Sequence, residues 1–207
     1  RGETTLTVEP QTYRGGHVAI EGDASAATYH AALATLHGSR VKITNLGDAT
    51  CQGDIAFFGV CEKLGATVER HSDSISIQGP SELGGLDAVD MIDMPDAAPT
   101  LFAMAPFLAR PIHITGLATL RRKECDRISC SATELRKAGV EVEEGPDYID
   151  ISPAETTGAT FSTYEDHRMA MALAVLATRT PGSKVLDPGC VSKTSTGFWD
   201  DLDRVYA

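Results

Sequence analysis

Apolar and polar residues recur along the chain in two spacings that follow each other in a fixed order. The mostly apolar run 26–36 ends before Gly38, which predicts a helix closed by a left-handed cap. Residues 41–44 then alternate between apolar and polar side chains, as a half-buried strand does. Beyond them the pattern predicts a second helix and two short strands, over about 54–64, 67–70 and 74–77.

The same order of elements returns twice. Asp96 follows Asp23 by 73 residues, Asp166 follows Asp96 by 70 residues, and each aspartate precedes a predicted helix. The second copy predicts a helix, a strand, a helix and two strands, over 100–108, 111–115, 123–137, 141–143 and 148–151. The third predicts a helix, a strand and a helix, over 169–178, 184–186 and 196–205.

Landmarks that recur at nearly one period indicate an internal repeat. Each unit is interpreted as β-α-β-α-β-β, which predicts an α/β fold with pseudo-threefold symmetry, its helices packed together and its small sheets outside. The units cover about 17–80, 86–153 and 158–207, and the third is incomplete because it lacks its final strand pair. Three unrelated βαβ segments in a doubly wound sheet are the alternative, and they leave the shared spacing unexplained.

Composition narrows the classes of function. The chain has 207 residues, 42% of them hydrophobic, so it can bury a core, and it has no apolar run near the roughly 20 residues that cross a bilayer. Its net charge of −11 argues against a polynucleotide partner but not against small anions held in a cleft. The chain starts with Arg1 rather than methionine, so we expect a piece of a longer protein.

Cysteine spacing gives no sign of a metal site or a disulfide framework. The five cysteines include no CxxC pair and have no histidine at ligand spacing, so ordinary reduced thiols and no zinc site are expected.

The densest charge cluster lies at residues 121–127. Lys123 and Arg127 are four residues apart and are predicted to share a helix face, with Glu124 in the first turn. Cations near a helix start suit a phosphate or carboxylate, and an adjacent acid suits proton transfer. A solvated charged face is the competing interpretation.

Two further segments carry candidate chemistry. His167 and Arg168 lead an otherwise apolar helix, which favours a ligand there, although Arg168 paired with an acid would explain it equally well. Lys193 is the single cation of a Pro- and Gly-containing loop at 187–194, where a solvated lysine is the simpler interpretation.

Aspartate before a helix commonly accepts backbone N–H bonds, so N-capping is the expected role of Asp23, Asp96 and Asp166 when each is considered alone.

Taken together, these segments resemble the enolpyruvyl transferase family, and within it the 5-enolpyruvylshikimate-3-phosphate synthases, over nearly the whole chain. The resemblance rests on many short motifs in the right order: Glu21–Ala26, Gln52–Asp54, Pro95–Ala98, Arg121–Arg127, Glu134–Gly139, Glu143–Tyr148, Asp166–Met171 and Lys193-Thr194.

The resemblance implies that residues 17–207 form the C-terminal lobe of an inside-out α/β barrel and that 1–16 cross from a missing N-terminal lobe. It implies transfer of the enolpyruvyl group from phosphoenolpyruvate to the 5-hydroxyl of shikimate 3-phosphate, with release of phosphate. A cytoplasmic monomer without cofactor is expected, as is inactivity of this lobe without its partner.

The resemblance also implies site residues. Asp96 would contact the shikimate hydroxyls, including the attacking one, and Glu124 would transfer the proton at the enolpyruvyl methylene. Thr119, which stands where many members have asparagine, and Lys123 would also bind the shikimate part. The phosphoenolpyruvate anion would lie against the remaining residues, His167 in a supporting place and Arg127, Arg168 and Lys193 in direct contact.

Three alternatives stay open. One is a transferase lobe that acts on UDP-N-acetylglucosamine, whose reactive cysteine would lie in the missing lobe. Another is a nucleic-acid enzyme built from the same repeat, such as an RNA 3′-phosphate cyclase, which the acidic charge disfavours. The third is a non-catalytic anion-binding module that keeps the repeat.

Overall fold

The strands form three small sheets in the computed structural model, which describes residues 7–206. The first sheet is antiparallel and has the order β1 (Arg40–Thr44), β3 (Ser74–Gln78), β2 (Thr67–Arg70). The second has the order β4 (Ala88–Asp90), β5 (Ile112–Thr115), β7 (Ile149–Ile151), β6 (Val142–Glu144), with only β4 and β5 parallel. The third pairs β8 (Thr160–Phe161) in parallel with β9 (Lys184–Val185).

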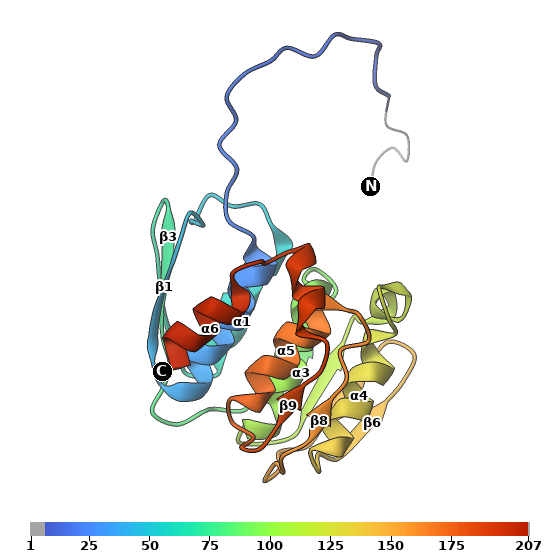
Figure 1. The fold of residues 1–207 in the computed structure, drawn as a ribbon. Helices are drawn as coiled ribbons and strands as arrows, with labels where there is room; N and C mark the ends of the chain where they lie inside the picture. The colour runs from blue at the N-terminus through green and yellow to red at the C-terminus, as the bar shows by residue number, and fades with distance from the viewer. Residues whose placement is uncertain (1–6, 207) are drawn as a thin grey trace.

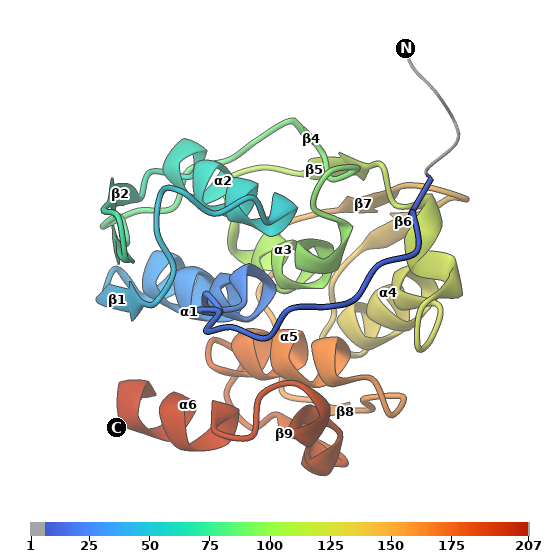
Figure 2. The ribbon, with the colours of Figure 1, turned by 90° about the horizontal axis from the view of Figure 1, so that it is seen from above.

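Three helices pack against one another inside these sheets: α1 (Ala24–His37), α3 (Ala98–Met104) and α5 (His167–Ala177). Figure 2 shows the three sheets on three different sides of this helical centre. The outer helices are α2 (Phe57–Lys63), α4 (Arg127–Lys137) and α6 (Phe198–Tyr206). Short 3-10 turns complete the fold: η1 (Gly53–Ala56), η2 (Pro95–Ala97), η3 (Ala105–Phe107), η4 (Ala118–Arg122) and η5 (Pro188–Lys193).

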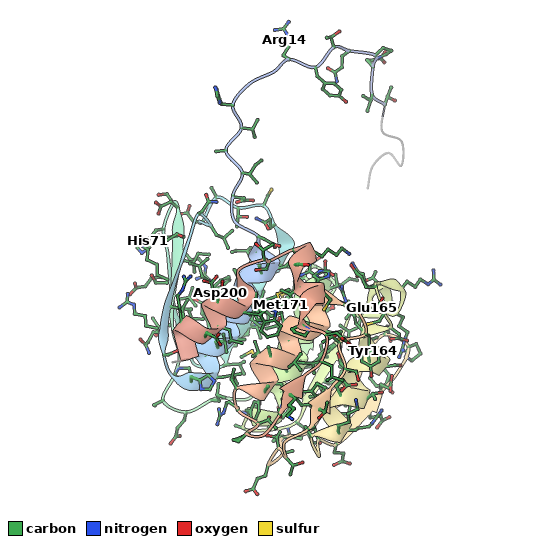
Figure 3. All side chains as sticks on the ribbon, viewed as in Figure 1. Arg14, His71, Tyr164, Glu165, Met171 and Asp200 are labelled. Atoms are coloured by element: carbon green, nitrogen blue, oxygen red, sulfur yellow. The ribbon has the colours of Figure 1, made fainter. Side chains whose placement is uncertain are left out.

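The inner helices are buried because their sequences are apolar around most of their circumference. In α5 every residue from Met169 to Leu176 is buried, and α1 buries residues on all its faces. The hydroxyls of Thr28 and Thr100 lie 3.0 Å apart and join α1 to α3. In Figure 3 the labelled Met171 lies amid this central packing. None of the helices within residues 7–206 is both long and apolar enough to span a membrane.

The second unit shows the complete predicted order of β4, α3, β5, α4, β6 and β7. The third unit comprises β8, α5, β9 and α6 within the described residues. The first unit differs, because residues 7–23 contain neither helix nor strand, and Val18 and Ile20 are 78% and 76% exposed. Figure 1 shows this segment leaving the domain.

The predicted first strand is therefore absent, and its hydrogen bonding explains why. The segment touches the first sheet only at its end, where the Gly22 N–H and the Ile20 carbonyl bond to Asn45. Without ladder bonds to β1, an extended run is not a strand. Of the predicted crossing segment 1–16, residues 1–6 lie outside the described residues.

Two other expectations change in detail. The helix predicted over 123–137 begins at Arg127, because the Asp126 carboxylate accepts the Ser129 N–H and caps the helix there. The loop predicted at 187–194 contains η5. Gly38 closes α1 with φ 60°, as its position predicts.

We predict that Gly38→Ala destabilises the domain by about 1–2 kcal/mol, because a side chain disfavours the left-handed conformation. The added Cβ would also lie 3.0 Å from the Pro80 carbonyl oxygen. Urea denaturation measures the loss. The control is Gly189→Ala, whose Cβ would meet no atom within 4 Å. Equal stability of the two variants would contradict the prediction.

Candidate active site

Charged side chains from four parts of the chain meet at the amino end of α5. They come from η2, from the segment between η4 and α4 together with the first residue of α4, from the start of α5 and from η5. The structure brings seven of the eight predicted site residues together: Asp96, Lys123, Glu124, Arg127, His167, Arg168 and Lys193. Thr119 lies exposed on η4, outside this network of ion pairs and hydrogen bonds.

Arg127 stands at the centre of the network, and its side chain is 1% exposed. Its Nε donates to Asp166 Oδ2 at 2.8 Å, and its Nη2 lies 3.2 Å from Asp166 Oδ1. Its Nη1 reaches Asp96 Oδ1 at 3.0 Å, and its Nη2 reaches Glu124 Oε2 at 2.7 Å. A buried guanidinium keeps its charge, so these three carboxylates provide the partners that burial requires.

Asp96 is not a helix cap, contrary to the expectation from its position. It lies within η2, and no side chain caps η2 or α3. Its carboxylate instead binds three cations, because Lys123 Nζ and Arg168 Nη2 each lie 3.2 Å from it, beside Arg127. Burial acts to raise the pKa of Asp96, but the neighbouring positive charges outweigh it and hold this pKa below its ordinary value.

Asp23 and Asp166 do cap their helices. The Asp23 carboxylate accepts the N–H groups of Ser25 and Ala26, and that of Asp166 accepts the Arg168 and Met169 N–H groups.

Lys123 and Arg127 do not share a helix face. Lys123 follows η4 in an extended conformation, and α4 starts only at Arg127. The two cations meet instead because both bind Asp96 Oδ1. The predicted cation pair therefore exists, but for another reason than the predicted one. The two cations are brought together by the carboxylate of Asp96, at least 27 residues earlier in the chain, and not by helical spacing.

Glu124 bridges α4 to η5. Its Oε1 accepts from Lys193 Nζ at 2.7 Å, and its Oε2 accepts from Arg127. The hydrogen bond from Lys193 is the main reason that the pKa of Glu124 falls to about 2. In this arrangement Glu124 is ionised at neutral pH and can take up a proton only when its cations are drawn away.

His167 lies at the first turn of α5 with its ring almost fully buried. Its Nδ1 has no hydrogen-bond partner among the described residues, since the nearest carboxylate oxygens, on Asp166 and Glu124, are 3.9 and 4.0 Å away. Burial lowers the pKa of His167, so the ring is neutral at neutral pH. An unpartnered buried nitrogen beside cations leaves one donor or acceptor for a ligand.

Sequence reasoning missed two residues of the site. Asp166 was expected only to cap α5, yet its fully buried carboxylate also holds Arg127. Tyr29 of α1 is fully buried near Arg168, and burial raises its pKa to about 12. The Asp166-His167-Arg168 motif could have indicated that Asp166 also binds Arg127, since a carboxylate has two oxygens and can cap a helix and bind a cation at once. Nothing local marked Tyr29.

The described residues offer no evident metal centre. Within residues 7–206, no group of three or more His, Cys, Asp or Glu side chains could hold a metal ion. The cysteines are free: Cys51, Cys61, Cys125, Cys130 and Cys190.

Solved structures share this fold. The enolpyruvyl transferase NikO from Streptomyces tendae superposes with a TM-score of 0.72 at 16% identity, over 90% of this chain and 43% of that one. EPSP synthase from Acinetobacter baumannii superposes with a TM-score of 0.78 at 26% identity, over 89% of this chain and 46% of that one. The fold is thus that of the enolpyruvyl transferases.

The sequence matches identify the family. The family model of EPSP synthase (3-phosphoshikimate 1-carboxyvinyltransferase) matches residues 1–202, so the chain belongs to the EPSP synthase family. It is 45% identical to a 3-phosphoshikimate 1-carboxyvinyltransferase of Nostoc punctiforme, over 91% of this chain and 44% of that protein. The corresponding enzyme of Yersinia pseudotuberculosis is 43% identical, over 94% and 46%. The chain therefore spans about half the length of these relatives.

We predict that Asp166→Asn destabilises the domain by about 3 kcal/mol, because it leaves the buried Arg127 guanidinium short of a negative charge. Urea denaturation at neutral pH measures the loss. The matched control is Asp201→Asn, which breaks an exposed pair with Arg204 and should cost less than about 1 kcal/mol. Equal losses in both variants would show that the buried pair contributes no more than a surface pair.

We predict that Lys193→Ala raises the pKa of Glu124 from about 2 toward the ordinary 4.5, as followed by a carbon NMR titration of its carboxyl group. A lowered folded-state pKa stabilises the fold above the unfolded pKa, and this contribution is lost as the pH falls through the folded pKa. The variant should therefore lose stability above about pH 4.5 and match the parent near pH 2. Lys42→Ala, on the exposed face of β1, should leave the titration of Glu124 unchanged.

Proposed function

We propose that residues 17–207 form the C-terminal lobe of a 3-phosphoshikimate 1-carboxyvinyltransferase, with 1–16 as the crossing from its other lobe. In this proposal the lobe is one half of an inside-out α/β barrel with pseudo-threefold symmetry. The arrangement of three small sheets around the inner helices supports the proposal, and so does the family membership. In this proposal, the part of the relatives that the chain does not cover would contain the missing lobe.

The proposed reaction joins phosphoenolpyruvate to shikimate 3-phosphate. The 5-hydroxyl oxygen bonds to C2 of phosphoenolpyruvate while C3 takes a proton, which gives a tetrahedral intermediate. C3 then loses a proton, the double bond re-forms and the C2–phosphate bond breaks, so the products are the enolpyruvyl ether and inorganic phosphate. Such a route needs a base at the hydroxyl, an acid at C3 and cations on the migrating charge.

The observation that carries this proposal is the network around Arg127, which places two partly exposed carboxylates among four cations. Asp96 and Glu124 are 29% and 31% exposed, so a substrate can reach both. We assign Asp96 to the shikimate hydroxyls and Glu124 to proton transfer at C3. The cations that would hold substrate anions are Lys123 for shikimate 3-phosphate and Arg127, Arg168 and Lys193 for phosphoenolpyruvate. His167 would support these cations. Thr119 would contact shikimate 3-phosphate only if its segment moves toward the site.

The ion pairs also suggest how the acid is prepared. In the lobe alone, Lys193 is bound by Glu124 and keeps it ionised. A phosphate that binds Lys193 competes with this carboxylate, and loss of the hydrogen bond lets the pKa of Glu124 rise from about 2 toward its ordinary value. Substrate binding would thus make Glu124 easier to protonate, as the addition step requires of its acid.

The UDP-N-acetylglucosamine alternative is not retained, because the family match is to EPSP synthase. The proposed cytoplasmic location and monomeric state follow from the family alone. The protein is proposed to use no cofactor, since its own acids and cations suffice for the chemistry.

We predict no turnover by this chain alone, because half of the anion contacts and the closure that excludes water are missing. Release of phosphate from phosphoenolpyruvate plus shikimate 3-phosphate measures turnover. Activity should appear when the uncovered half of the Nostoc punctiforme relative is added. Turnover by the chain alone would contradict the prediction.

In the active mixture, Glu124→Gln should lower kcat by about 10²–10⁴-fold, the range typical of a lost general acid or base. The matched control is Glu69→Gln. Glu69 lies on β2 in an exposed pair with Arg40 of β1, and its substitution should leave kcat unchanged. Absence of activity in a mixture shown to form a folded complex would favour the non-catalytic anion-binding module instead.

A further inference from the structure

A strained turn leads into the site. Between β8 and α5, Tyr164 and Glu165 both adopt left-handed backbone conformations, with φ 56° and 57°. Among residues 7–206, the other non-glycine residues with positive φ are Asn45 and Asp187, and neither has such a neighbour. Residues with a bulky or long side chain disfavour this conformation, so two in succession persist only where surrounding contacts hold them. The next three residues are Asp166, His167 and Arg168.

A buried carboxylate outside the proposed chemistry holds this turn. Glu134 of α4 is fully buried. Its Oε1 accepts from the Tyr164 hydroxyl at 2.5 Å, and its Oε2 accepts from the Ser162 backbone N–H at 3.1 Å. Lys137 Nζ lies 2.8 Å from both oxygens and balances the charge. Each carboxylate oxygen therefore accepts one hydrogen bond from the turn and one from Lys137.

The same helix grips the turn at its other end. Arg127, two turns before Glu134 on α4, binds the Asp166 carboxylate. Asp166 in turn bonds the Thr163 carbonyl through its N–H and caps α5 through its side chain. The segment from Ser162 to Asp166 is thus fixed to one rigid element at both ends.

Packing does not explain the Tyr164 contact. The Tyr164 side chain is 37% exposed, and Glu165 is exposed as well. Figure 3 shows both labelled residues on the α4 side of the domain, away from the labelled Met171 of the central packing. The hydroxyl of Tyr164, rather than burial of its ring, is what ties the turn to Glu134.

We propose that Glu134 is a positioning residue, which through Tyr164 and the Ser162 amide holds the left-handed turn and so fixes the place of Asp166, His167 and Arg168 in the site. The proposal deepens the proposed function, since it concerns the residues assigned to the phosphoenolpyruvate anion. Its test needs no substrate, so a failure of turnover and a failure of this proposal remain distinguishable.

The decisive variant is Tyr164→Phe, which removes one hydroxyl from a partly exposed ring and should leave the domain folded. The first measurement is amide hydrogen exchange at Arg168, whose N–H bonds Asp166 Oδ1 at 2.8 Å, relative to Leu33 inside α1. We expect exchange at Arg168 to accelerate at least about tenfold more than at Leu33, because a local release opens only the turn and the start of α5. Tyr13→Phe, at a ring that is 92% exposed, is the matched control.

The second measurement is an NMR titration of the His167 ring. Burial lowers its pKa, with Asp166 and Glu124 acting to raise it and Arg168 and Arg127 acting to lower it. Release of the turn should hydrate the ring and bring its titration closer to the ordinary value in Tyr164→Phe. Glu134→Gln should shift the titration in the same direction, because the amide oxygen can still accept from Tyr164 while its NH₂ group cannot accept from Ser162.

Rescue separates positioning from stability. Asparagine tolerates the left-handed conformation better than most residues, so Glu165→Asn added to Tyr164→Phe should return exchange at Arg168 and the His167 titration toward the parent values. The proposal is overturned if Tyr164→Phe lowers the melting temperature while Arg168 and Leu33 accelerate equally and His167 titrates as in the parent. The Glu134 network would then only stabilise the domain.

Discussion

Burial of the Arg127 guanidinium is the constraint on which the site depends. A charge that is 1% exposed and cannot lose its proton must meet carboxylates at hydrogen-bonding distance. Those carboxylates come from η2, from the segment before α4 and from the start of α5, so satisfying one arginine fixes three parts of the chain. The arrangement is costly to break at any single partner, which makes the site rigid before a substrate arrives.

The same inner helices form the apolar centre and contribute residues to the charged site. The inner helices α1, α3 and α5 pack through small and aliphatic side chains, and two of them begin at capping aspartates. Helix starts carry partial positive charge, so the end at which anions are proposed to bind is favourable for them even where side chains pair among themselves. In the free lobe the carboxylates occupy the cations, and a phosphate must compete with Glu124 and Asp96 for them.

Much of the fold could be predicted from local signals. The strand β2 occupies Thr67–Arg70 as predicted, because alternating side chains and flanking turns define a short strand by themselves. The inner helices follow from apolar runs, which come after capping aspartates in α1 and α5, and the repeat indicated their order. The absence of the predicted first strand of the first unit could not be foreseen, because a strand exists only when a partner offers ladder bonds, and residues 7–23 have none within the described chain.

The candidate site was predicted as a set of residues but not as a geometry. Sequence alone determined which charged groups stand next to helix starts, since capping and spacing act within a few residues. Only the tertiary structure decided that Asp96 binds Lys123 instead of capping a helix, and that Asp166 both caps α5 and holds Arg127. The physical reason is that a carboxylate pairs with the cations that lie near it in space, and residues 27 to 72 positions apart meet only after the helices have packed.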